Sequence, residues 1–128
     1  MSDKYADGLK VVKEMLGEQN AESMKSLLGS SKFGAQRAEL ALDFVFGQLW
    51  GRPGLDRRGR SLVTIGILIA LGATNELKFH VLAAIKNGCT VKEIEEALYH
   101  SIAYAGFPRA TQATEAATEA YRAAGMID

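Results

Sequence analysis

One stretch of the chain limits the fold more than any other: the apolar run LVTIGILIALGA, from Leu62 to Ala73. It is shorter than the roughly 20 residues that a transmembrane helix needs, so we expect a buried core helix. Residues 62–71 are apolar on every side, and such a helix has to be covered all round. A chain of 128 residues buries only about two-thirds of its unfolded surface on folding. Covering the helix is easier if subunits share it, so the run favours a homo-oligomer.

Helical spacing continues through the rest of the sequence. Tyr5, Leu9, Val12 and Leu16 recur three or four residues apart, which is typical of one apolar helix face. No sustained alternation of apolar and polar residues, the sign of a strand, is present. We therefore predict an all-α bundle of six to seven helices in a single domain, residues 1–128. The expected helices cover about 5–16, 21–28, 38–49, 56–71, 74–88, 90–106 and 108–125.

Three local signals predict where helices begin or the chain turns. Asp56 is suited to cap the apolar helix at its N-terminus. Thr90 and Glu93 form a T-x-x-E capping box at the start of a later helix. Pro53, in the sequence GRPG, predicts a rigid turn between two helices.

The charge balance excludes several classes of protein. Fifteen Lys and Arg residues balance fifteen Asp and Glu residues, so the formal net charge is zero. No basic excess is available to bind the phosphates of nucleic acid or an anionic membrane surface. The first residues, MSDKYADGLKVVKEM, are amphipathic and lack the apolar core of a signal peptide, so we expect a cytoplasmic protein.

Cys89 is the single cysteine of the chain. It can form no internal disulfide, no CxxC redox motif and no thiolate zinc site. It follows a helix-ending glycine and precedes the capping Thr90, where a thiolate is somewhat favoured by the next helix. With no resolving cysteine, an inert small residue is the better interpretation.

Both histidines stand at helical spacing from a glutamate. His80 follows Glu76 by four residues, and His100 follows Glu96 by four and precedes Tyr104 by four. Residues four apart share one face of a helix, so each set can converge on one volume. A carboxylate that orients an imidazole suits acid–base catalysis, although most such pairs are only surface hydrogen bonds. No third ligand completes a zinc site, and we expect no metal.

A basic cluster is the next candidate for a binding site. Arg52, Arg57, Arg58 and Arg60 fall within the turn GRPGLDRRGR and the start of the apolar helix. Arginine binds carboxylates through paired hydrogen bonds, although composition alone favours a solvated turn with salt bridges. Phe107, in the turn AGFP, is expected to pack or to line a pocket.

These segments together resemble the γ-carboxymuconolactone decarboxylase family. The resemblance rests on WGRPGLDRRGRSLVTIGILIALG at 50–72, NELKFHVLAAIKNGCTVKEIEEAL at 75–98 and HSIAYAGFP at 100–108. It implies the all-helical fold of the wider alkylhydroperoxidase D-like superfamily. It also implies a homo-oligomer, a trimer or a hexamer, with the site near subunit contacts. In the redox branch of that superfamily two cysteines stand where this chain has Ala73 and Glu76, so thiol-peroxidase chemistry is not expected.

The activity that the resemblance implies is decarboxylation of γ-carboxymuconolactone to β-ketoadipate enol-lactone, in protocatechuate breakdown. No cofactor is expected, because the substrate itself accepts the electrons that the departing CO₂ leaves behind. The site needs cations for the substrate carboxylates, a donor to the developing oxyanion and a proton donor. The resemblance thus implies that the protein binds a small lactone dicarboxylate as its substrate.

The residue roles follow the same resemblance. Arg60, with Arg52 or Arg57, is expected to bind substrate carboxylates. His80, oriented by Glu76, is expected to donate the proton or to stabilise the oxyanion. Two further residues, His100 and Tyr104, complete the polar wall, and Phe107 lies near the departing carboxylate.

Two other functions stay open at this point. Phe107 and Arg109 depart from the usual family pattern and can reshape or recharge the pocket, so a diverged member acting on another lactone acid is one alternative. A peroxide-handling protein that uses Cys89 is the other, and it would need an external thiol partner.

Overall fold

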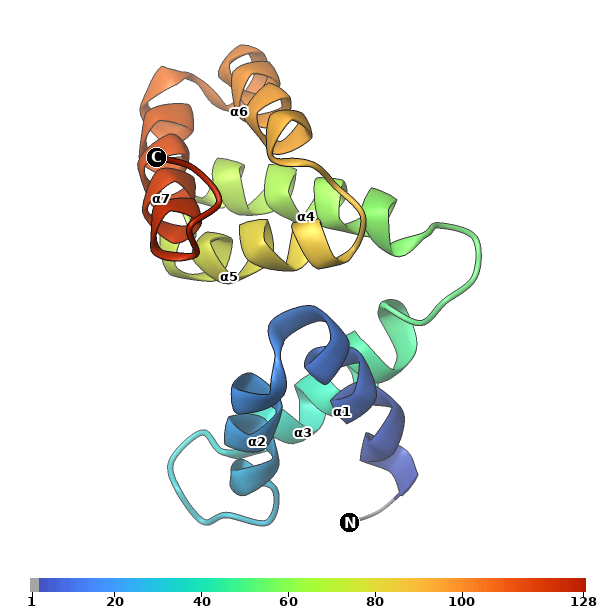
Figure 1. The fold of residues 1–128 in the computed structure, drawn as a ribbon. Coiled ribbons are helices and arrows are strands. Elements are labelled where there is room, and N and C mark those ends of the chain that lie inside the picture. The colour runs from blue at the N-terminus through green and yellow to red at the C-terminus, as the bar shows by residue number, and fades with distance from the viewer. Residues whose placement is uncertain (1–2) are drawn as a thin grey trace. The chain divides into compact units, whose positions relative to one another are not determined.

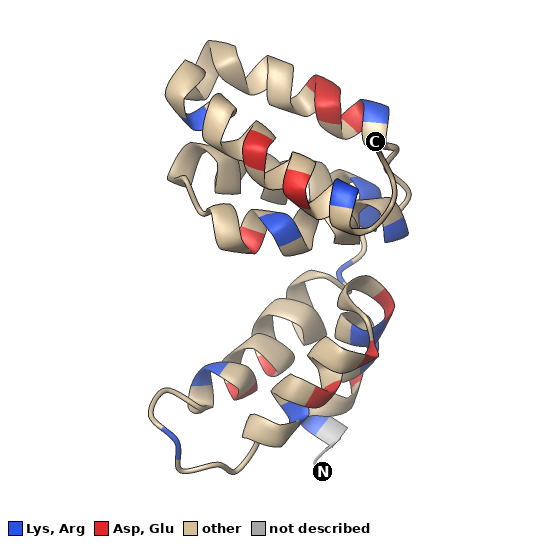
Figure 2. Ribbon diagram, turned by 60° about the vertical axis from the view of Figure 1, so that its left-hand side comes forward, with Lys and Arg blue, Asp and Glu red and all other residues tan. Residues whose placement is uncertain are grey.

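The computed structural model describes residues 3–128 and confirms the all-α prediction (Figure 1). The helices in this range are α1 (Asp3–Leu16), α2 (Glu18–Leu27), α3 (Gln36–Leu40), η1 (Ala41–Leu49), α4 (Arg57–Leu71), α5 (Thr74–Lys86), α6 (Val91–Ala105) and α7 (Phe107–Ala123). Contacts divide the chain between Leu55 and Asp56 into two compact units, which we call the N-terminal and C-terminal units. Both carry residues of each charge sign (Figure 2). That residues 1–128 fold as a single domain stays a prediction.

In the N-terminal unit α1 packs against α2 and η1. Val12, Met15 and Leu42 are fully buried between these helices. The two backbones approach closely at Gly8, where an added Cβ would lie 2.0 Å from the carbonyl oxygen of Leu42. Only glycine fits there, because the obstacle is backbone rather than a movable side chain.

The helix predicted at 38–49 is present, but most of it is wound as a π-helix. α3 continues directly into η1, and the Trp50 N–H donates to the Val45 carbonyl, five residues back, at 3.0 Å. At Gly47 a Cβ would lie 2.6 Å from the Leu42 carbonyl oxygen, so a glycine suits the wider winding. Apolar periodicity distinguishes helix from strand but does not reveal this local change of pitch.

The C-terminal unit is a four-helix arrangement around one core. α4 packs against α5, α6 and α7, and α7 also packs against α5 and α6. Large buried side chains such as Ile65, Val81 and Ile94 meet an alanine-rich face of α7. Tyr121 of α7 donates its hydroxyl to the Val81 carbonyl at 2.8 Å, and burial holds the pKa of this phenol above its usual range. These contacts fix the positions of α4, α5 and α6 relative to one another.

Two predicted helix starts are confirmed, and a glycine that the sequence analysis did not single out ends α4. The Asp56 side chain accepts from the Gly59 N–H at 2.7 Å and caps α4. Thr90 and Glu93 form both bonds of the capping box at the start of α6. Gly72 ends α4 with φ 70° and a Schellman arrangement, in which the Ala73 N–H donates to the Leu68 carbonyl.

The apolar helix predicted at 62–71 is α4, and the other helices of the C-terminal unit cover only one side of it. Ser61, Ile65 and Ile69 are buried. The opposite side exposes Val63, Ile67 and Leu71, which keep 55%, 53% and 66% of their surface open to solvent. We call these three residues the α4 stripe. The expectation of full coverage is therefore not met within the C-terminal unit.

None of the helices in the described part of the chain is both long enough and apolar enough to cross a membrane.

Candidate active site

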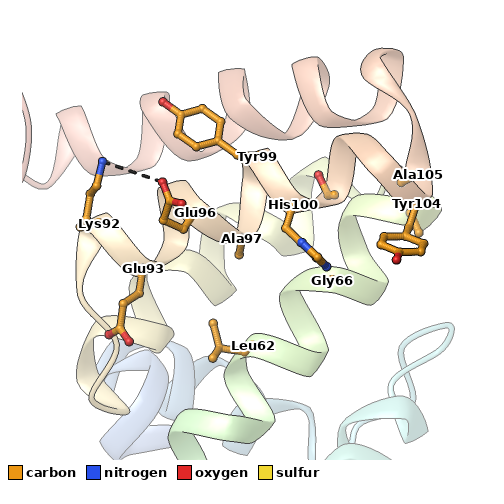
Figure 3. Close-up of a pocket in the computed structure, with 12 residues that line it drawn as sticks. Leu62, Gly66, Lys92, Glu93, Glu96, Ala97, Tyr99, His100, Tyr104 and Ala105 are labelled. Atoms are coloured by element: carbon orange, nitrogen blue, oxygen red, sulfur yellow. Dashed lines mark ion pairs between the residues drawn. The ribbon is translucent and has the colours of Figure 1, made fainter.

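A groove lies between α4 and α6 in the C-terminal unit (Figure 3). Its volume is about 910 Å³, within the usual range for small-molecule sites. Side chains of α4 form an apolar floor, and α6 supplies a more polar wall. The lining residues are Leu62, Gly66, Ala70, Lys92, Glu93, Glu96, Ala97, Tyr99, His100, Ser101, Tyr104 and Ala105.

The groove brings together two of the predicted site residues. His100 and Tyr104 lie one turn apart on α6, with ring centroids 5.4 Å apart and planes tilted by 41°. Both side chains are exposed, and both are available to a ligand in the groove. The Ser101 hydroxyl beside them donates to the Leu98 carbonyl at 2.6 Å, which leaves its oxygen to accept a bond.

Charged residues gather at one end of the groove and largely neutralise one another. Lys92 Nζ lies 2.7 Å from the Glu95 carboxylate and 3.9 Å from that of Glu96. Glu93 pairs with Arg58, so this arginine of the basic cluster is bound to a structural carboxylate. This end of the groove therefore carries no excess of positive charge for a dicarboxylate.

The Glu76–His80 pair lies on α5, and neither residue lines the groove. The His80 imidazole is half-buried, while Glu76 is exposed in the first turn of the helix. Burial lowers the pKa of His80 below 6.5, and the negative charge of Glu76 opposes this effect without cancelling it. At neutral pH the imidazole is therefore mainly uncharged, with one N–H donor and one acceptor nitrogen.

The remaining predicted residues do not line the groove either. Arg57 and Arg60 are half-buried in the first turn of α4. Arg52 is exposed and belongs to the N-terminal unit, and Phe107 is exposed at the first position of α7. The structure thus separates the eight predicted residues into the groove pair, the α5 pair and four others.

Sequence reasoning did not identify the groove floor or the place of Arg109. Gly66 and Ala70 follow Leu62 at four-residue steps, so helical periodicity alone would have put them on one face. Arg109, in the first turn of α7, lies against Gly72 at the end of α4, a contact between residues far apart in the sequence.

Cys89 has the environment of a structural residue. It is only 4% exposed, and its Sγ lies 3.8 Å from the Arg58 carbonyl oxygen. Burial raises the pKa of the thiol, which disfavours the thiolate that peroxide chemistry requires. This environment argues against the peroxide-handling alternative.

No group of three or more metal-binding side chains occurs among residues 3–128 that could hold an ion.

Comparison with known proteins defines the class to which this helical protein belongs. The model of the carboxymuconolactone decarboxylase family matches residues 36–119. The chain is 38% identical to the 4-carboxymuconolactone decarboxylase of Acinetobacter baylyi, over 96% of this chain and 90% of that protein. The chain therefore belongs to the carboxymuconolactone decarboxylase family, as the sequence motifs predicted.

Other relatives differ in their named activity. The chain is 39% identical to the nitrosuccinic acid decarboxylase of Metarhizium robertsii, over 85% of this chain and 75% of that protein. It is 35% identical to an uncharacterized 15.0 kDa protein of Paracoccus denitrificans, over 62% of this chain and 61% of that protein. Two relatives of similar identity thus bear the names of decarboxylases with different acid substrates.

Proposed function

We propose that the protein is a carboxy-lyase that converts γ-carboxymuconolactone to β-ketoadipate enol-lactone and CO₂. The observation that carries the proposal is the half-buried His80 beside Glu76 in a chain 38% identical to a 4-carboxymuconolactone decarboxylase. The cytoplasmic location expected from the sequence stays a prediction.

The reaction needs little from the protein beyond groups that position the substrate and stabilise the charge that develops on it. The departing carboxylate is attached to the carbon γ to the lactone carbonyl, across a carbon–carbon double bond. When the C–C bond breaks, its electron pair moves through the double bond to the carbonyl oxygen and gives a dienolate. Protonation at the carbon α to the carbonyl then forms the enol-lactone. Because the lactone accepts the electrons, no cofactor is required in this scheme.

His80 is the residue to which we assign the developing oxyanion. Its lowered pKa leaves the imidazole mainly neutral, and a neutral imidazole donates a hydrogen bond without prior protonation. Glu76 lies one helical turn away and favours the tautomer and orientation of the ring. The hydrogen bond from His80 to this oxygen becomes stronger as negative charge develops on it. The bond therefore stabilises the transition state more than the bound substrate, which lowers the barrier.

The arginines orient the anionic substrate. Arg60, with Arg57, supplies positive charge for the carboxylate that is retained in the product. A tight pair with the departing carboxylate would stabilise the ground state and slow the loss of CO₂. We therefore assign the departing group to less polar surroundings. His100 and Tyr104 line the α4–α6 groove, which His80 does not, so their expected role as a polar wall stays a prediction.

The second candidate is decarboxylation of another small diacid. It is favoured by the 39% identity to a nitrosuccinic acid decarboxylase, which is as high as the identity to the lactone enzyme. Parallel assays of CO₂ release from γ-carboxymuconolactone and from nitrosuccinate separate the two candidates. We expect kcat/KM to be at least about 100-fold higher for the lactone, because a specific site commonly discriminates by this factor. A preference for nitrosuccinate would reverse the assignment.

A further inference from the structure

We propose that Asn87, which ends α5, is a positioning residue that sets where Arg60 stands relative to His80. It holds the first turn of α4, which carries Arg60, through a hydrogen bond to Ser61. The inference rests on the proposed function, in which Arg60 binds the retained carboxylate and His80 stabilises the oxyanion. In this role Asn87 touches neither the substrate nor the reacting atoms.

The bond between Asn87 and Ser61 joins two helices in the interior of the C-terminal unit. The Asn87 side-chain amide donates to the Ser61 hydroxyl oxygen at 2.9 Å. Ser61 is only 1% exposed. A buried hydroxyl costs free energy unless it is hydrogen-bonded, whereas an alanine would fill nearly the same space without that cost. The contact with Asn87, rather than packing, therefore explains a hydroxyl at this position.

The segment that leads from α5 into α6 makes two more contacts with the same turn of α4. The Cys89 thiol donates to the Arg58 carbonyl oxygen, with 3.8 Å between the two atoms. The Arg58 side chain pairs with Glu93 in the first turn of α6. Residues 87–93 therefore hold the start of α4 at its backbone and at two of its side chains.

These contacts divide the arginines at the start of α4 into two groups. Arg58 pairs with Glu93, so it serves the packing of the turn. Arg57 and Arg60 lie three residues apart and therefore share one side of the helix. The contacts that fix this turn thus also fix the point from which both of these side chains extend.

The bond to Asn87 also sets the register of α4 against α5. The two helices lie side by side and run antiparallel, because a two-residue turn joins them and Ser61, near the start of α4, meets Asn87 at the end of α5 (Figure 1). His80 stands seven residues before Asn87, about 10 Å along the α5 axis. The bond therefore links the helix of Arg60 to the helix of His80 without contacting the imidazole.

This link matters for a substrate that both residues hold at once. Arg60 fixes the retained carboxylate, while His80 has to meet the developing oxyanion of the same molecule. A misplacement of about 1 Å can lower the rate of such a reaction by up to about 100-fold. Loss of the bond lets the start of α4 shift, so it should weaken substrate binding through Arg60 and leave His80 in place.

A purely structural role is the competing explanation, since any buried hydrogen bond between helices stabilises the fold. The chain offers a matched comparison: the Tyr121 hydroxyl donates to the Val81 carbonyl at 2.8 Å and joins α7 to α5. Tyr121→Phe removes this bond and leaves the start of α4 intact. If both bonds were only structural, Asn87→Ala and Tyr121→Phe would both lower the unfolding midpoint and neither would change ligand affinity.

The first arm of the test is a double-mutant cycle on the binding of succinate, a diacid that does not react, measured by titration calorimetry. Asn87→Ala should weaken binding about 5-fold, and Tyr121→Phe should bind like the wild type. Ser61→Ala removes the other half of the same bond and should match Asn87→Ala. Arg60→Gln should weaken binding about 10-fold, and adding Asn87→Ala to it should cause no further loss, because Asn87 acts through Arg60.

Turnover of γ-carboxymuconolactone forms the second arm. For Asn87→Ala we expect a KM raised about 5-fold with kcat nearly unchanged. Three results would overturn the assignment: additive losses in the double variant, an equal loss of affinity in Tyr121→Phe, or equal succinate binding by Asn87→Ala and the wild type, including no binding by either. The predicted pattern of succinate binding without lactone turnover by the wild type would retain the role of Asn87 and reject the proposed function.

Discussion

At the scale of single residues, the protonation state of His80 decides which chemical role it can have. Burial lowers the pKa of its imidazole, while the charge of Glu76 raises it and has the smaller effect. For His80 to be a protonated imidazolium at neutral pH, the charge of Glu76 would have to raise the pKa by more than burial lowers it. The environment therefore favours a neutral hydrogen-bond donor at the developing oxyanion.

This role predicts the direction of the pH dependence. If neutral His80 is the active form, kcat/KM should stay level from pH 8 to about pH 7 and fall as the pH drops through the lowered pKa, below 6.5. Glu76→Gln removes the charge that raises the pKa, so the fall should move to still lower pH. Initial rates across a pH series measure both effects. A rate that rises toward acid pH would instead make the imidazolium the active form.

At the scale of helices, the sequence predicted where each helix begins and ends better than how a helix is wound or which helices pack together. Asp56 and the Thr90–Glu93 box act within one turn of their own helix, so the local sequence is sufficient to predict these caps. The π-helical winding of η1 and the α4–α6 groove depend on how closely separate segments approach. Arg109 meets Gly72 only after α7 has packed, which no local pattern encodes.

The close approach of α1 and η1 gives a prediction for stability. Gly8→Ala should lower the free energy of unfolding by about 1–3 kcal/mol, because the new methyl group would collide with the Leu42 carbonyl and force the helices apart. Gly66→Ala is the matched control: its Cβ meets no atom within 4 Å, and alanine raises helix propensity by up to about 1 kcal/mol.

Urea unfolding at one fixed protein concentration compares these two variants with the wild type, because stability depends on concentration in an oligomer. Equal free energies of unfolding for Gly8→Ala and the wild type would contradict the close contact.

At the scale of the whole molecule, the exposed α4 stripe supports the homo-oligomer that the sequence predicted. Val63, Ile67 and Leu71 line up at four-residue steps on a helix with no charge beyond its first turn. An apolar row of this kind is typical of a surface that another subunit covers. A trimer or a hexamer remains our proposal for the assembly.

The stripe predicts how the assembly responds to a charge. Ile67→Glu places a carboxylate in the middle of the row, so we expect a lower molar mass than that of the wild type in light scattering coupled to size-exclusion chromatography. Gln112→Glu, an exposed position on α7, adds the same charge outside the stripe and should leave the mass unchanged. A monomeric wild type, or equal masses for Ile67→Glu and the wild type, would show that the stripe is not an interface.

The central claim is decarboxylation of γ-carboxymuconolactone with His80 as the donor to the oxyanion. Proton NMR in D₂O with a chelator present follows both the product and the carbon that receives the proton. We predict enol-lactone with one deuterium at the carbon α to the carbonyl, formed well above the uncatalysed rate. His80→Ala should lower kcat by about 100-fold or more. A wild type without product above background, or a His80→Ala variant at the wild-type rate, would contradict the claim.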